Sequence, residues 1–166
     1  MSVAEGRNGK ITIRPTSGSS TEHTIAEMGE WSISGISRNM IDFTAFGDTV
    51  AKHKPGMLDP GTISFSGWYD ATDSTGQASI ITLLTSGTII ASSSNTAPWL
   101  LKLWTNDDSS FDDWGYFRVP AAANSGIYIT SMELGTNKDG LCSVNFTGKI
   151  TGSMIGWTSG NTVGAA

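Results

Sequence analysis

The stretch Trp31–Asp70, WSISGISRNMIDFTAFGDTVAKHKPGMLDPGTISFSGWYD, shows how the chain is organised. At its start, Trp31 and Ile33 alternate with serines, and residues 62–69 alternate in the same way near its end. A two-residue period is typical of a strand with one buried face. A further candidate strand covers residues 39–46. The stretch therefore predicts strand, strand, irregular loop and strand.

The predicted loop covers residues 46–60. It holds two glycines and two prolines, Pro55 among them, and its most basic run is Lys52-His53-Lys54. A long loop without secondary structure inside a compact domain is usually functional or disordered. We therefore expect a functional loop with a basic tip.

The same alternation extends to the rest of the chain. It is clearest at residues 142–151, where Cys142, Val144, Phe146 and Ile150 share one face, and Cys142 is therefore expected to point into the core. Further strands are predicted at residues 10–14, 98–105, 115–119 and 126–135. The fold class is mainly β: a β-sandwich or barrel of about eight strands with one flanking α-helix.

The single predicted helix covers about residues 74–86. Ser74 and Gln77 have the spacing of a capping box, and Gly87 is well placed to end the helix. Ile80, Leu83 and Leu84 fall on one face at helical spacing, which predicts that this face packs on the sheets.

Length and composition favour one domain at 1–155, followed by a short, flexible C-terminal tail at 156–166. Charged residues make up 15% of the chain and its net charge is −5, which argues against a protein that grips nucleic acid. The low charge also favours a surface that is buried against neighbouring subunits. Without a signal sequence, an apolar span or a second cysteine, the chain is expected to fold in a cytoplasm without membrane insertion.

Residues with catalytic or metal-binding chemistry form no convincing site. The only histidines, His23 and His53, lie in polar segments without an obvious partner. The acidic run 107–113 does not match a calcium-loop template, so no metal, cofactor or catalytic residue is predicted. Its acids are interpreted as an acidic interface loop: Asp107, Asp108, Asp112 and Asp113.

Six tryptophans leave two interpretations open. They could form the sugar-stacking surface of a monomeric carbohydrate-binding β-sandwich, or they could serve core and interface packing. Packing is favoured. Trp68 and Trp104 are predicted to lie off the core, because each alternates with the main apolar residues of its strand.

Three segments resemble the major tail tube protein of long-tailed, siphovirus-like bacteriophages: Trp31-Ser-Ile-Ser-Gly, Ile41-Asp-Phe-Thr-Ala-Phe-Gly-Asp48 and Lys54-Pro-Gly-Met-Leu-Asp-Pro-Gly-Thr-Ile-Ser-Phe-Ser-Gly-Trp-Tyr-Asp70. The resemblance is specific over residues 31–70 and general over 71–151. It implies hexameric rings with a continuous inner β-barrel, stacked into the tube through which the genome leaves. It implies no catalytic residue.

The resemblance also implies that the long loop reaches a neighbouring subunit or ring. By position, the residues implied to form the hinge into that loop are Asp42, Thr44, Phe46, Gly47 and Asp48. Because Lys52, His53 and Lys54 oppose the acids of 107–113 in sign, we expect an intersubunit contact between the two segments.

Further partners follow from the resemblance. They are a tape measure protein in the lumen, tail terminator and distal tail or baseplate proteins at the tube ends, and duplex DNA in transient passage. The location implied is the virion tail, after assembly in the host cytoplasm. The alternatives kept open are the carbohydrate-binding module and another phage ring protein, such as a tail terminator or head decoration protein.

Overall fold

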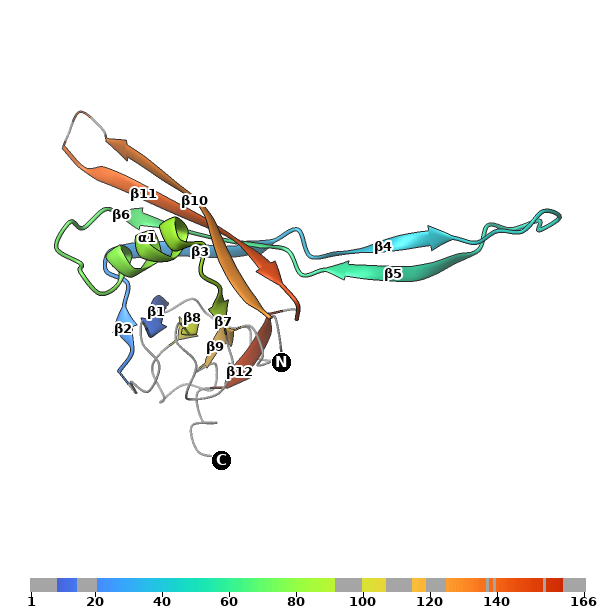
Figure 1. Cartoon of the computed structure of the whole chain (residues 1–166), viewed down its shortest axis with the longest axis horizontal. Coiled ribbons are helices and arrows are strands. Elements are labelled where there is room, and N and C mark those ends of the chain that lie inside the picture. Colours follow the sequence, from blue (N-terminus) through green and yellow to red (C-terminus); the bar gives the residue numbers. More distant parts are fainter. Residues whose placement is uncertain are drawn as a thin grey trace.

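The computed structural model describes residues 9–14, 21–91, 100–106, 115–118, 125–136, 138, 140–153 and 155–159. They form a body of two five-stranded antiparallel sheets, from which a long two-stranded arm projects (Figure 1). The mainly β prediction with one flanking helix is confirmed.

The first sheet has the strand order β12-β9-β8-β1-β2. Its strands are β1 (Lys10–Arg14), β2 (His23–Thr24), β8 (Leu100–Asn106), β9 (Gly115–Arg118) and β12 (Gly156–Ser159). Because β12 pairs with β9, this sheet extends four residues into the segment that was expected to be a flexible tail. His23 lies in β2 rather than in a loop.

The second sheet has the order β3-β6-β11-β10-β7. Its strands are β3 (Met28–Ser34), β6 (Thr62–Trp68), β7 (Ile90–Ala91), β10 (Gly126–Thr136) and β11 (Cys142–Thr151). The predicted strands at 62–69, 126–135 and 142–151 are therefore present within a few residues of their expected bounds.

The core lies between the two sheets. Ile11 and Ile13 of β1 face Phe65 of β6 and Phe146 of β11, whose ring centroids are 5.3 Å apart. Alternation fails at the end of this layer, where Cys142 and Tyr69 are exposed. The prediction of a core cysteine is wrong because Cys142 is the first residue of β11, beyond the part of the strand that the other sheet covers.

Helix α1 (Gln77–Ser86) adds Ile80 and Leu83 to the core as fully buried side chains, and Leu84 packs beside them as a partly buried one. Gly87 ends the helix in the left-handed conformation, as expected.

The predicted capping box is wrong. The Asp73 carboxylate instead accepts hydrogen bonds from the backbone N–H groups of Gly76 and Gln77, at 2.7 and 2.9 Å. Gln77 Nε2 turns inward and donates to the carbonyl oxygens of Ala26 and Trp68. The Gln77 side chain therefore ties the helix to the second sheet instead of closing a box with Ser74.

The arm overlaps the strand predicted at 39–46 and replaces the irregular loop predicted at 46–60 with a second strand and a short connection. It consists of β4 (Ser37–Asp42) and β5 (His53–Asp59), an antiparallel pair joined by a connection at residues 43–52. Lys54 and Pro55 are therefore strand residues, paired with Ile41 and Met40. The prediction of a basic loop tip is wrong, because His53 and Lys54 lie on the shaft of the arm.

Candidate assembly surfaces

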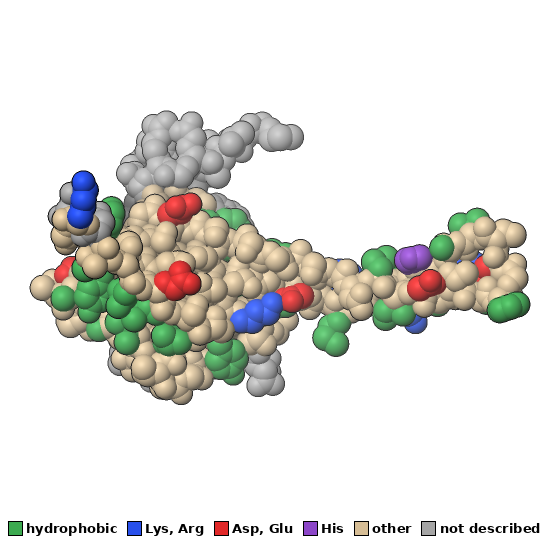
Figure 2. Space-filling model, turned by 90° about the horizontal axis from the view of Figure 1, so that it is seen from above, with side chains coloured by type: hydrophobic (Ala, Val, Ile, Leu, Met, Phe, Trp, Pro, Cys, Tyr) green, Lys and Arg blue, Asp and Glu red, His purple; other side chains and the backbone are tan. Residues whose placement is uncertain are grey.

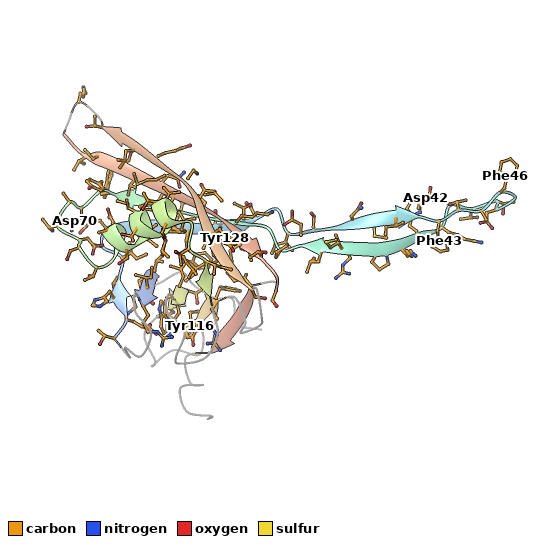
Figure 3. All side chains as sticks on the ribbon, in the orientation of Figure 1. Asp42, Phe43, Phe46, Asp70, Tyr116 and Tyr128 are labelled. Atoms are coloured by element: carbon orange, nitrogen blue, oxygen red, sulfur yellow. The ribbon has the colours of Figure 1, made fainter. Side chains whose placement is uncertain are left out.

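The arm exposes apolar side chains to a degree that is unusual for a monomer. Every residue of β4 is exposed, and the large apolar side chains of the arm stand free at its tip and along its shaft (Figures 2 and 3). The exposed ones are Ile36, Met40, Ile41, Phe43, Phe46, Val50 and Met57. An isolated two-stranded hairpin is only marginally stable in water. The arm is therefore expected to pack against another protein surface.

The tip of the arm, residues 42–52, is ordered by polar side chains that bond to its own backbone. Asp42 Oδ1 accepts hydrogen bonds from the backbone N–H and the hydroxyl of Thr44, at 2.8 and 2.6 Å. Thr44 Oγ1 in turn accepts one from the N–H of Lys52, at 2.9 Å. Because the Thr44 donors favour the ionised carboxylate, they lower the pKa of Asp42.

A second carboxylate closes the tip. Asp48 Oδ1 lies 2.6 Å from Lys52 Nζ, and Asp48 Oδ2 accepts a hydrogen bond from the N–H of Ala45 at 2.8 Å. Both contacts lower the pKa of Asp48, the lysine contact most. Gly47 has φ 103°, a left-handed value that favours glycine over residues with a Cβ.

The structure thus gathers the residues that were expected to form a hinge, but it places them at the far end of the arm. Asp42, Thr44 and Asp48 order the tip, and Phe46 projects from it with 112% of its reference surface exposed (Figure 3). Lys52 is paired with Asp48, so it offers a partner less free charge than expected. Asp107, Asp108, Asp112 and Asp113 lie outside the described residues.

The arm joins the body through two segments with glycines of positive φ, Gly35 and Gly61. Gly61 has no room for a side chain, because a Cβ there would lie 2.4 Å from the carbonyl oxygen of Ser34. Next to it, Lys149 Nζ contacts both Asp59 oxygens, at 2.6 and 2.9 Å. We call this Lys149–Asp59 contact, with Gly35 and Gly61, the arm root. The sequence does not predict the contact, because Lys149 is 90 residues from Asp59.

The second sheet turns a polar face away from the core. Its rows follow from the strand register: Glu30, Ser66, Asn145 and Glu133 in one, and Ser32, Ser64, Thr147 and Ser131 in the next. This face lines a hollow of about 750 Å³. Hydroxyl and amide groups predominate, as expected from the serine- and threonine-rich strand faces.

The same sheet has two free edges among the described residues. β3 pairs only with β6, and β10 beyond Ile127 pairs only with β11. A strand with unpaired backbone groups is a template for a further strand. The strands β3, β6, β11 and β10 alternate in direction, so β3 and β10 run antiparallel to each other.

Two of the six tryptophans lie off the core, as predicted. Trp68 is exposed at the end of β6. Trp104 is partly buried on the outer face of the first sheet, where its Nε1 donates to Thr12 Oγ1 and its ring packs against that of Tyr116, with centroids 4.7 Å apart and planes tilted by 54°. Burial raises the pKa of Tyr116.

In the part of the chain that the structure describes, no three acidic, histidine or cysteine side chains cluster as metal ligands. No helix in this part is long and apolar enough to cross a membrane.

No protein-family model matches the sequence, and no curated protein matches it. Solved structures do match. The tail of the empty gene transfer agent particle, refined with C6 symmetry, contains a chain 18% identical, with TM-score 0.57 over 90% of this chain and 96% of that one. The SPP1 tail tube gives 13% identity and TM-score 0.60 over 93% of this chain and 79% of that one. The sheath/tube terminator of the PVC extracellular contractile injection system gives 10% identity and TM-score 0.60 over 92% and 94%.

These matches come from one kind of assembly, a tail or injection tube, although the sequence identities are low. Each of the three aligns over at least 90% of this chain. The chain therefore has the tail-tube fold.

Proposed function

We propose that this chain is a structural virion protein that assembles into stacked hexameric rings, forming the phage tail tube through which DNA is ejected into the host. The observation that carries the proposal is the four-stranded sheet β3-β6-β11-β10, which has two free edges among the described residues and one polar face, on a tail-tube fold. The role is structural rather than enzymatic.

Ring closure follows from the strand directions. When copies are related by rotation about one axis, β10 of one copy meets β3 of the next in antiparallel fashion, like every pair inside the sheet. Lateral pairing of this kind removes both free edges. The sixfold symmetry of the gene transfer agent tail supports a ring of six.

The polar face would line the channel. Six copies of four strands make about 24 strands, and at roughly 4.8 Å spacing and 45° tilt the backbone diameter is on the order of 50 Å. Subtracting the side chains leaves a lumen of roughly 40 Å, which admits duplex DNA. Glu30 and Glu133 are the acids of this face, and they repel phosphate rather than bind it.

The arm is proposed as the contact to a neighbouring subunit or ring. Its members are the tip residues Asp42, Thr44, Phe46, Gly47, Asp48 and Lys52 with the shaft residues His53, Lys54 and Pro55. The support is the exposed apolar surface of the arm and the preorganisation of its tip, which lowers the entropy cost of docking. The acids of 107–113 remain a proposed partner for Lys54.

Other partners belong to the same proposal. A terminator would cap one end of the tube and distal tail or baseplate proteins the other, since structures of both kinds match this fold. A tape measure protein would occupy the lumen during assembly in the host cytoplasm, and the finished protein would reside in the virion tail.

Electron microscopy of the purified protein tests the proposal. We expect hexameric rings and open tubes at high concentration, and light scattering should show masses far above that of the 17.5 kDa monomer. A protein that stays monomeric at millimolar concentration would contradict the proposal and favour the carbohydrate-binding module. Closed rings that never stack would favour a terminator or decoration protein.

A further inference from the structure

We propose that one half of the polar face of the second sheet is a binding surface for a cationic, amphipathic polypeptide segment inside the tube. The inference rests on the proposed tube function, and it adds the chemistry of the segment and the residues that hold it. We call this surface the channel patch, and its members are Glu30, Ser66, Trp68, Glu133 and Asn145.

The first feature of the channel patch is an indole on a face that otherwise carries mostly hydroxyl and amide groups. Trp68 pairs with Ser143, and Ser143 pairs with Gly135. These positions are two residues from the pair Ser66 and Asn145, so Trp68 shares the polar face with that pair. Its neighbours in the row, a serine and a glycine, are small, and the Trp68 side chain remains 45% exposed.

The backbone of Trp68 is held from two sides. Its N–H donates to the Glu27 carbonyl at 3.0 Å, and its own carbonyl accepts a hydrogen bond from Gln77 Nε2 at 2.8 Å. Gln77 is fully buried, so this second contact ties Trp68 to the interior of the protein. An exposed aromatic side chain on an ordered backbone loses little entropy when it binds, which is typical of an interface anchor.

The second feature is negative charge that is not neutralised within the chain. Glu30 on β3 and Glu133 on β10 end one row of the sheet, with one residue each of β6 and β11 between them. Three strand spacings of about 4.8 Å separate the two backbones by roughly 14 Å. Among the described residues neither glutamate forms an ion pair. The one base of these four strands is Lys149, at the other end of the face, where it pairs with Asp59.

The two features together select the chemistry of the occupant. Carboxylates attract lysine and arginine side chains and repel phosphate, so the preferred occupant is a polypeptide rather than a nucleic acid. The indole can hold a cation over its face or pack against an aliphatic or aromatic side chain. An amphipathic segment with a basic and an apolar face satisfies both groups at once. The hollow of about 750 Å³ gives its side chains room to enter the wall.

The channel patch covers only half of the polar face. The other half carries Tyr128 beside Lys149, whose charge Asp59 neutralises. In a ring of copies related by rotation, the patches lie at one level and form a belt, and stacking repeats the belt along the tube. Contacts that are weak singly become strong when they are repeated. Such a wall holds an occupant without gripping any one part of it, which suits a polypeptide that leaves before DNA passes.

Co-sedimentation of assembled tubes with synthetic peptides tests the inference. The probe is an amphipathic helix with arginine on one face and leucine on the other, present while the tubes assemble. It should sediment with wild-type tubes, and the bound fraction should fall as salt is raised. A matched peptide with glutamate in place of every arginine should not bind. A second one with alanine in place of every leucine should bind distinctly more weakly.

Substitutions in the wall locate the site. Glu30→Gln with Glu133→Gln, and separately Trp68→Ser, should each raise the Kd of the arginine–leucine peptide about tenfold or more. Glu27→Gln is the control for charge, because Glu27 is an exposed acid in the turn before β3, outside the rows of the face. Tyr128→Ser is the control for the aromatic ring, because Tyr128 is 42% exposed on the other half of the same face. Neither control should change the Kd.

The outcomes separate this inference from the proposed function. Three results with wild-type tubes would each overturn the channel patch and leave the tube intact: no uptake of the arginine–leucine peptide, equal uptake of the glutamate peptide, or stronger retention of duplex DNA. A wild-type Kd in either patch variant would do the same. Where a variant forms no tubes by electron microscopy, the peptide series on wild-type tubes decides. Wild-type protein without tubes would overturn the proposed function and this inference with it.

Discussion

Lys149 on β11 holds Asp59 at the root of the arm through contacts of 2.6 and 2.9 Å to both carboxylate oxygens. The pair joins the body to the arm beside the backbone segments at Gly35 and Gly61. It therefore restrains the direction in which the arm leaves the body. Both side chains are about half exposed, so the pair adds little to global stability.

We predict that Lys149→Met leaves the melting temperature nearly unchanged but loosens the arm. Faster amide hydrogen exchange in residues near the arm root and a broader range of arm directions in small-angle scattering should report this change. Lys54→Met is the control, because Lys54 is an exposed lysine of the arm that is not part of this pair. Equal arm order in Lys149→Met and wild type would contradict the restraint.

The ion pair between Lys149 and Asp59 should persist over a predictable pH range. The hydrogen bond from Lys149, then that from the Gly61 N–H, lowers the pKa of Asp59 below its ordinary value. The carboxylate therefore stays ionised as the pH falls through that ordinary value. The arm should loosen only in stronger acid, where Asp59 is finally protonated, and hydrogen exchange measured across this range checks the sign.

The body of this fold could be predicted from the sequence, because burial on one face imposes alternation. Val144, Phe146 and Ile150 alternate as expected since the other sheet covers them. The same rule predicts that Cys142 lies in the core, but Cys142 is exposed. Alternation alone does not show where along a strand the covering sheet ends. Local pattern fixes the face of a strand but not the extent of its cover.

Only the first strand of the arm could be predicted, since β4 overlaps the strand expected at 39–46. Residues 53–59 bury almost nothing in the monomer, so no buried face marks β5, and Pro55 with Gly56 is typical of a loop. The tip depends on side-chain bonds such as Asp42 to Thr44, which hydropathy does not reveal. The helix begins at Gln77 rather than at the predicted residue 74. The local sequence does not show this, because the Gln77 side chain is hydrogen-bonded to Ala26, 51 positions away, instead of capping the helix.

Helix α1 should respond unequally to truncation of two adjacent leucines. Leu83 is fully buried and Leu84 only partly, although the sequence places both on the core face. Leu83→Ala should cost about 2–5 kcal/mol of unfolding free energy, and Leu84→Ala distinctly less, because less packed surface is lost. Denaturant melts of the two variants check this order, and an equal or reversed order would contradict the burial.

The ionised Asp73 carboxylate should make the free energy of unfolding depend on pH. Burial raises the pKa of Asp73, but hydrogen bonds from the backbone N–H groups of Gln77, Ala26, Gly76 and Thr75 outweigh burial and lower it below the ordinary 3.8. A lowered folded-state pKa means that the stabilisation is complete above the unfolded-state value. It is lost as the pH falls through the folded-state value.

We therefore expect Asp73→Asn to lose about 1–3 kcal/mol at neutral pH, since the amide cannot accept all of these hydrogen bonds. The difference from wild type should shrink as the pH falls below 3.8. Asp70→Asn is the matched control, because the Asp70 carboxylate accepts hydrogen bonds only from Thr72 among the described residues. A difference that stays constant into strong acid would show that the Asp73 charge has no part.

The last prediction concerns charge on the shaft of the arm. Lys52 is neutralised by Asp48, so Lys54 is the lysine of the basic run that stays available to a neighbouring copy. Lys54→Glu should leave the melting temperature nearly unchanged, because the side chain is exposed, but it should slow tube growth if an acidic segment of another copy steers docking. Asp112→Lys with Asp113→Lys should partly restore growth.

The control is Lys52→Gln. This change should act by loosening the tip, which faster hydrogen exchange at Ala45 would show. The Asp112→Lys and Asp113→Lys pair should not rescue it. Growth rates by light scattering at two salt concentrations complete the test, because an electrostatic effect must weaken as salt rises. Wild-type growth of Lys54→Glu at low salt would contradict the charge contact and leave the apolar tip as the sole proposed arm contact.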